Sequence, residues 1–161
     1  MQADMNKNYG VQSRNDGIQQ IGRRRWEVFF GFGEDETGTY NYRQIVEYKP
    51  SLDEVKDMIL GQINASVQEQ ILSGFLYRDR VVWLSAENQR NIALAYAMAK
   101  GGDIQTLPTL KLGSDDDYEL YTFQDVNELV AFAVQVQEHI EGCIAAGRTE
   151  KESVDWTKYV V

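Results

Sequence analysis

Two side chains near the end of the chain have types and spacing that could do chemistry together. His139 and Cys143, the only histidine and the only cysteine, are four residues apart, which places both on one face of a helix. A histidine base beside a thiol is the arrangement of a nucleophilic cysteine. No third group is indicated to orient the histidine, and Cys143 falls on the apolar stripe of the predicted helix. We therefore interpret Cys143 as a small buried hydrophobe and His139 as a boundary residue, and we expect no catalytic residues.

Two further motifs are weak candidates for ligand binding. The acidic run Gly113–Asp117 offers carboxylates to a hard cation such as calcium, but it lacks the spaced ligands and the closing glutamate of an EF-hand loop. The Gly31–Gly33 segment is not followed by the Gly-Lys-Ser/Thr of a phosphate-binding loop. We interpret the acidic run as a solvated hairpin loop. We expect no metal and no cofactor.

Five residues suit contacts with a protein partner. Arg23, Arg24 and Arg25 are three consecutive positive charges, which fit an acidic protein better than a nucleic acid. Tyr40 and Tyr42 belong to a set of nine tyrosines, whose rigid rings and polar tips suit interfaces. The same properties suit the rim of a small core, and the sequence does not separate these two interpretations.

The composition limits the class of protein. A chain of 161 residues with 43% apolar residues suits one globular domain. The net charge of −9 argues against nucleic-acid and membrane-surface binding, which need a basic face. No apolar run approaches the roughly 20 residues of a transmembrane helix, and the first residues lack the apolar core of a secretory signal. We therefore expect a soluble protein that is made and used without export.

One stretch is expected to organise the fold. Ile71–Tyr77 and Arg80–Leu84 are rich in β-branched and aromatic residues, which predicts two strands, and the Arg78-Asp79 pair between them is short enough for a hairpin. Ser85 then takes the position of a helix N-cap. A hairpin alone cannot bury a side chain as large as that of Trp83. We therefore expect Trp83 in the core, with the other elements packed around it.

Periodicity and capping signals predict the remaining elements. We predict strands at Trp26–Phe32, Thr39–Tyr48, Thr106–Leu112 and Tyr118–Phe123, and helices that begin after Ser51, after Ser85 and near Asp125. The first helix is expected to weaken at Gly61 and Asn64, before a short helical turn that precedes Ile71. The last helix is expected to close at Gly147. Together these elements predict an α+β class, with antiparallel β-hairpins packed against two longer helices and one shorter helix.

The first 25 residues are predicted to be a polar, basic arm, followed by a single α+β domain over residues 26–161. Residues 1–25 carry a net charge of +3, against −12 for the rest, and their first 22 show neither a helical nor a strand period. One interpretation is a docking tail that becomes ordered on a partner. The other is a floppy terminus. Under both interpretations the arm adds little to the stability of the domain.

Most of the chain after Tyr48 resembles a phage and prophage domain of unknown function, common in Bacteroides-type genomes and found in proteins associated with tail fibres. The residues that carry the resemblance are ILSGF at 71–75, VWLSAENQRN at 82–91, TLPTLKLG at 106–113, and Gly147 followed by KESVDWTKY at 151–159. The family often has Asn-Gly where this chain has Arg78-Asp79, a departure confined to the turn.

The resemblance implies a structural or assembly role in a phage and supplies no catalytic residues. We therefore expect a non-enzymatic virion component, tail- or fibre-associated and made in the bacterial host cytoplasm. Its expected partners are other phage structural proteins, or copies of itself in a symmetric assembly. The alternative is an assembly chaperone that leaves before the virion is complete. An enzyme that uses His139 or the acidic loop is the third and least favoured interpretation.

Overall fold

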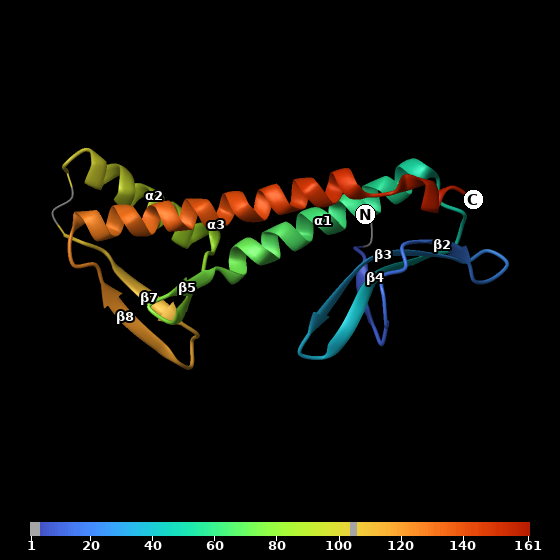
Figure 1. The fold of residues 1–161 in the computed structure, drawn as a ribbon, viewed down its shortest axis with the longest axis horizontal. Helices are drawn as coiled ribbons and strands as arrows, with labels where there is room; N and C mark the ends of the chain where they lie inside the picture. The colour runs from blue at the N-terminus through green and yellow to red at the C-terminus, as the bar shows by residue number, and fades with distance from the viewer. Residues whose placement is uncertain (1–3, 104–105) are drawn as a thin grey trace. The chain divides into compact units, whose positions relative to one another are not determined.

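The structure, a computed structural model, describes residues 4–103 and 106–161. These residues form eight strands, three α-helices and one short 3-10 helix, and the strands make two four-stranded antiparallel sheets (Figure 1). The predicted α+β class is confirmed. The chain divides into two compact units rather than the single domain that we predicted. The first unit contains residues up to Ser66 together with Thr149–Val161, and the second contains Val67–Arg148.

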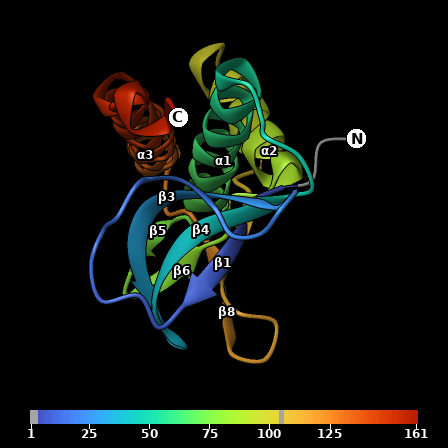
Figure 2. The same ribbon diagram turned by 90° about the vertical axis from the view of Figure 1, so that its right-hand side faces the viewer.

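The first unit is built on a sheet whose strand order is β1-β4-β3-β2 (Figure 2). Its strands are β1 (Asn6–Tyr9), β2 (Gly17–Gln20), β3 (Trp26–Asp35) and β4 (Gly38–Val46). Helix α1 (Leu52–Ser73) packs its apolar stripe on one face of this sheet. The core here combines Met5, Val28, Phe30, Val55, Met58, Ile59, Ile63, Val154 and Tyr159.

The carboxyl-terminal residues complete this first core. The 3-10 helix η1 (Trp156–Tyr159) buries Tyr159, whose hydroxyl donates a hydrogen bond to the backbone oxygen of Phe29 at 2.7 Å. Burial raises the pKa of Tyr159, so this hydroxyl keeps its proton and remains a donor. This hydrogen bond ties the end of the chain to strand β3, across 130 positions of sequence.

Residues 1–25, predicted to be a polar, basic arm, contribute two strands to the first unit, and residues 1–3 lie outside the described part of the chain. β1 pairs with β4, and β2 pairs with β3, so both strands belong to the first sheet. Met5 is buried in the core. The segment lacks a strand period because β1 and β2 are the edge strands of the sheet, whose polar side chains are mostly solvent-facing.

Helices α1 and α3 (Val126–Ser153) are longer than we predicted. α1 begins at the expected capping box, in which the backbone N–H groups of Ser51 and Glu54 donate to each other's side chains. It runs through Gly61 and Asn64, and Ile71 therefore lies in the helix rather than in a strand. A single glycine costs only about 1 kcal/mol in a helix, which the buried stripe offsets. α3 likewise continues through Gly147.

The second unit has a sheet with strand order β5-β6-β7-β8. Its elements are β5 (Phe75–Tyr77), β6 (Arg80–Val82), α2 (Ala86–Lys100), β7 (Thr109–Gly113), β8 (Tyr118–Thr122) and the first part of α3. Ser85 caps α2 as predicted, because its hydroxyl accepts a hydrogen bond from the Asn88 N–H at 3.1 Å. The helices cover one face of this sheet. Their common core contains Val82, Leu84, Leu112, Tyr121, Phe123, Leu129, Phe132 and Val136.

Trp83 is not in this core, and our prediction that it is buried is wrong. Its side chain is 50% exposed, whereas Val82 and Leu84 on either side are fully buried. Side chains alternate across a strand, so the residue between two inward-facing neighbours points outwards. The core that the hairpin needs is supplied instead by Phe75 and Tyr77, which pack against Phe132.

The predicted two-residue hairpin between β5 and β6 is confirmed. Arg78 and Asp79 have φ values of +53° and +64°, which is the geometry of a type I′ turn. A side chain with a Cβ is disfavoured in this left-handed region, and aspartate is tolerated better than most residues.

We expect the stability of variants at position 79 to follow the order Gly, Asp, Ala. Asp79→Gly removes the conformational penalty, whereas Asp79→Ala introduces a residue that tolerates this left-handed backbone less well than aspartate does. The two variants should differ by about 1 kcal/mol in the free energy of unfolding. Urea melts of the three proteins measure this order, and an alanine variant as stable as the glycine variant would contradict the turn geometry.

We expect Met5→Ala to destabilise the first unit by about 2–3 kcal/mol, because it removes a buried side chain from the core. Ser13→Ala, in an exposed loop of the same segment, should change the stability by less than about 0.5 kcal/mol. Thermal and urea melts followed by circular dichroism measure both changes. Equal effects for the two variants would mean that residues 4–20 do not contribute to the stability of the first unit.

Candidate protein-binding surfaces

The structure brings His139 and Cys143 together without the features of an activated nucleophile. His139 Nε2 lies 3.8 Å from the sulfur of Cys143 and 3.2 Å from the backbone oxygen of Gln70. Cys143 is buried, and burial raises the pKa of its thiol. Reactive cysteines need a lowered pKa, since the thiolate is the nucleophile. The two side chains are close enough for a dyad, but the raised pKa of the thiol is that of a buried, unactivated cysteine.

The acidic loop is held by cations of the chain itself. The Ser114 N–H donates to the backbone oxygen of Asp117 at 3.0 Å, which closes the turn between β7 and β8. Lys111 lies 2.7 Å from Asp115 and lowers the pKa of that carboxyl, and Arg80 lies 3.1 Å from Asp117. Across the described parts of the chain, no three or more His, Cys, Asp or Glu side chains are arranged to hold a metal ion.

The five residues predicted to bind a partner do not form one site. Arg23, Arg24 and Arg25 lie in the exposed turn between β2 and β3, where Arg25 pairs with Glu47 at 3.2 Å. This turn adjoins the end of the β3–β4 ladder at which Trp26 pairs with Val46, whereas Tyr40 pairs with Gly33 towards the other end.

Tyr40 and Tyr42 are half-buried and have partners within the first unit. The ring of Tyr40 lies 5.7 Å from that of Tyr9, and the amino group of Lys7 sits over it at 4.4 Å. Lys7 and the Tyr9 hydroxyl both donate to Asp35, and these bonds lower the pKa of Asp35 to about 2. These contacts favour the core-rim interpretation of the two tyrosines, which the sequence left open.

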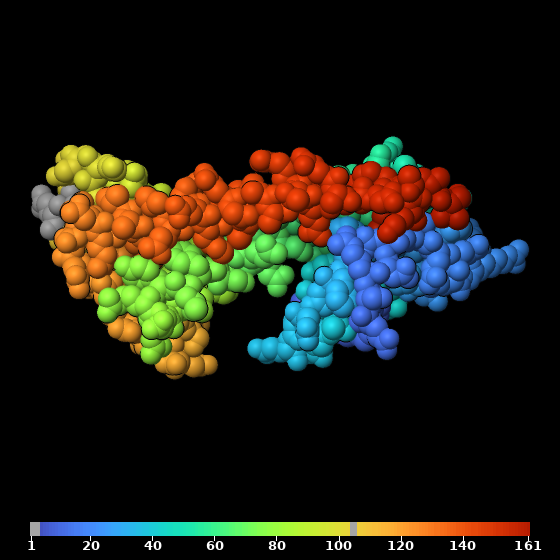
Figure 3. All heavy atoms as spheres, in the orientation of Figure 1, coloured from blue at the N-terminus to red at the C-terminus, as the bar shows by residue number. Residues whose placement is uncertain are grey.

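A different surface stands out on the second unit. On its sheet, the face turned away from the helices presents Leu76, Val81, Trp83, Lys111, Tyr118 and Leu120, and we call this set the outer face. Leu76 lies directly opposite Val81 on neighbouring strands, and Lys111 lies directly opposite Leu120. Leu76 is 68% exposed and Leu120 is 64% exposed. In Figure 3 the β5–β6 hairpin, in light green, and the β7–β8 hairpin, in orange, form adjoining parts of the surface.

A patch of this kind is typical of a protein-binding surface. Contiguous exposed apolar side chains are uncommon on a sheet that faces only water, and tryptophan and tyrosine are the residues that most often carry binding energy. The amino group of Lys111 lies 4.7 Å from the ring centre of Tyr118, so one cation sits among the apolar side chains. Asp115 pairs with the same amino group at the edge of the patch.

Sequence reasoning missed the outer face because the segment of β6 that contributes to it is apolar on both sides. Residues 81–84 read Val-Val-Trp-Leu, and such a run is the usual sign of a strand buried on both faces. This apolar run indicates that both faces of the strand are covered. Within the described unit, helices cover only one of those faces, so the other remains exposed.

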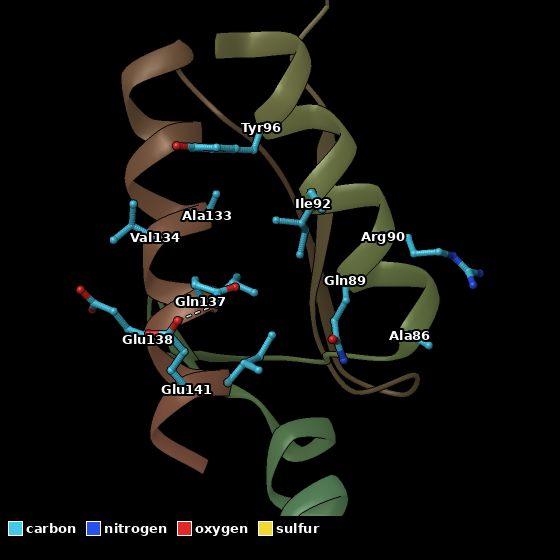
Figure 4. A pocket seen from close by; sticks show the side chains of 13 residues that line it. Ala86, Gln89, Arg90, Ile92, Tyr96, Ala133, Val134, Gln137, Glu138 and Glu141 are labelled. Atoms are coloured by element: carbon cyan, nitrogen blue, oxygen red, sulfur yellow. Dashed lines mark hydrogen bonds between the residues drawn. The ribbon is translucent and has the colours of Figure 1, made fainter. Parts of the chain in front are cut away.

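A second surface is the groove between α2 and α3. It has a volume of about 820 Å³ and is lined by Ala86, Gln89, Arg90, Ile92, Ala93, Tyr96, Ala133, Val134, Val136, Gln137, Glu138, Ile140 and Glu141. Figure 4 shows that the two helices run antiparallel, with Tyr96 beside Ala133 at one end and Ala86 towards Glu141 at the other. We call this the α2–α3 groove. Its floor is apolar, and its charged residues lie on the rims.

We expect Cys143 to react with a thiol reagent more slowly than free cysteine at neutral pH. Burial hinders access, and the raised pKa keeps the thiol protonated until the pH exceeds the ordinary thiol pKa. Alkylation by iodoacetamide, followed by mass spectrometry over a range of pH, measures the rate. A fast reaction that is already complete below that pKa would indicate an activated dyad with His139.

One of the comparisons with known proteins identifies a family. None of the helices in the described ranges is long and apolar enough to cross a membrane. No curated protein and no solved structure matches the chain. One family model matches residues 54–159, from the first turn of α1 to the end of η1, so that all four strands of the first sheet lie before the match. Because the match covers well over half of the sequence, the chain belongs to the family described as domain of unknown function DUF4376.

Proposed function

We propose that the chain is a non-enzymatic component of a phage virion that acts through protein–protein contacts, and that the outer face of the second sheet is the surface that binds its partner. The observation that carries the proposal is the set of apolar side chains exposed together on this face, with Trp83 half exposed among them. A solvent-facing sheet surface normally carries polar residues in alternation with the core. A partner that covers these side chains gains the free energy of their burial.

The phage setting rests on the resemblance of residues 82–91, VWLSAENQRN, and the same stretch contains Trp83. The outer face also lies inside the residues that match the family, whereas Arg23–Arg25, Tyr40 and Tyr42 lie outside them. This supports a change in the expected partner contact, from the first sheet to the second. A tail or tail-fibre protein with an apolar surface and an acidic residue opposite Lys111 is the partner that this face fits.

The non-enzymatic part of the proposal rests on the state of the candidate catalytic groups. The thiol of Cys143 has a raised pKa, and the carboxylates of the acidic loop pair with Lys111 and Arg80. The thiol lacks the lowered pKa of a nucleophilic cysteine, and Asp115 and Asp117 are occupied by cations of the chain itself.

The test is a pair of variants whose folding is measured separately from their incorporation into particles. Trp83→Ser with Leu120→Ser removes two large apolar side chains from the outer face, at positions where solvent already reaches both side chains. Val160→Ser is the matched control, an exposed apolar residue in the first unit. We expect both proteins to melt within a few degrees of the wild type.

Quantitative mass spectrometry of purified particles then gives the copy number of each protein. We expect the control to be incorporated normally and the double variant to be lost from the particle. Normal incorporation of the double variant would reject the outer face as the contact. A wild-type chain that is present in assembly intermediates and absent from finished particles would favour the alternative, a transient assembly chaperone.

A further inference from the structure

The second half of helix α2 is apolar around its circumference, and yet the helix has no buried residue. Residues 92–99 read Ile-Ala-Leu-Ala-Tyr-Ala-Met-Ala, which is more than two turns without a charged or amide side chain. A helix that is apolar all round is normally buried all round. In the second unit, Ile92, Ala95 and Ala99 pack against the core, while the α2–α3 groove is lined by Ala93, which is exposed, and Tyr96, which is half-buried. The remaining apolar surface of α2 therefore lacks a cover within this unit.

The α2–α3 groove is shaped for another pair of helices. Its lining combines the small side chains of Ala93 and Ala133 with the larger apolar side chains of Ile92, Tyr96 and Val134. Small side chains on facing helices permit the close approach of a further helix, whose own ridge of side chains fills the groove. A volume of about 820 Å³ accommodates several such side chains.

The two rims of the groove carry opposite charges. Arg90 lies on the α2 rim, and Glu138 lies on the α3 rim. Figure 4 shows that the two side chains point outwards from opposite sides of the groove, with their charged ends at a similar level along the helices. Among the described residues, neither takes part in an ion pair. Each charged group is thus free to meet a partner.

We infer that the α2–α3 groove is a self-association surface, in which two copies of the chain pack their α2–α3 pairs face to face about a twofold axis parallel to the helices. Such an axis places α2 of one copy over α3 of the other and keeps every residue at its own level. Arg90 of each copy then lies opposite Glu138 of the other copy. A twofold interface repeats each contact, so the two rims form two equivalent ion pairs. The surface is therefore complementary to itself in charge as well as in shape.

This inference is independent of the proposed function, because it uses helices on the covered side of the second sheet rather than the outer face. The chain's net charge of −9 opposes the association of two copies at long range. At physiological ionic strength this repulsion is largely screened beyond about 8 Å, and the local ion pairs then set the register.

The experiment is a charge swap between copies, measured by sedimentation equilibrium at physiological salt over a wide range of concentration. The wild-type chain should approach twice its monomer mass of 18.4 kDa. Arg90→Glu alone and Glu138→Arg alone should each weaken the dimer about tenfold or more, because like charges then meet twice across the interface. An equimolar mixture of the two variants should form a heterodimer with near wild-type affinity, since one ion pair then has its native polarity and the other has its polarity reversed.

Two controls separate this surface from others. Arg24→Glu makes the same change of charge in the first unit and should leave the dimer unchanged, and circular dichroism checks that all the variants fold. Trp83→Ser should also remain a dimer, which distinguishes the α2–α3 groove from the outer face.

Three results would overturn the inference. If the wild-type chain stays monomeric at every concentration, the groove does not bind a second copy, and a helix of a different protein becomes its expected occupant. Trimers or larger species would exclude the twofold arrangement. Single variants that dimerise normally, or a mixture that fails to recover the affinity, would place the self-contact elsewhere.

Discussion

The second unit depends on the packing of Phe132, which is fully buried on α3. Its ring centre lies 4.9 Å from that of Tyr77, 5.1 Å from that of Phe123 and 6.0 Å from that of Phe75. These contacts hold α3 on one face of the sheet and fix which side chains of the strands point inwards. Because side chains alternate along a strand, placing Val82 inside places Trp83 outside. The exposure of apolar side chains on the outer face follows from this inward orientation of Val82.

The length of the second unit explains why two apolar surfaces remain open. A unit of this size, Val67–Arg148, buries only about 60–70% of the surface that its unfolded chain would expose. Helices α2 and α3 cover one face of the sheet, and α2 is itself only partly covered. The outer face and the α2–α3 groove lie on different sides of the same core and share no residue. Under the two proposals, the unit binds two neighbours at once, one through a flat sheet and one through a helical groove.

The sequence predicted those parts of the structure that local chemistry determines. The capping box at Ser51, the N-cap at Ser85 and the two-residue turn after Tyr77 each depend on neighbouring residues, and all three were confirmed. The errors concern choices made by distant residues. β1 and β2 exist because β3 and β4 offer them free edges, which no period within residues 4–20 reveals. The orientation of Trp83 depends on Phe132, and the strand itself is apolar on both faces. The candidate surfaces were missed for the same reason, since each is defined by what the rest of the unit fails to cover.

The first unit is discontinuous in the sequence, since its core needs Val154 and Tyr159 as well as the strands of the first sheet. During synthesis on the ribosome, the sheet and α1 emerge long before these last side chains do. The second unit is a continuous segment, so it can fold before the last residues of the first unit, Thr149–Val161, have been synthesised. Closing a loop of this length costs only a few kcal/mol of chain entropy, and a folded second unit shortens that loop in advance. We therefore expect the inserted unit to form first, and the unit that begins the chain to be completed last.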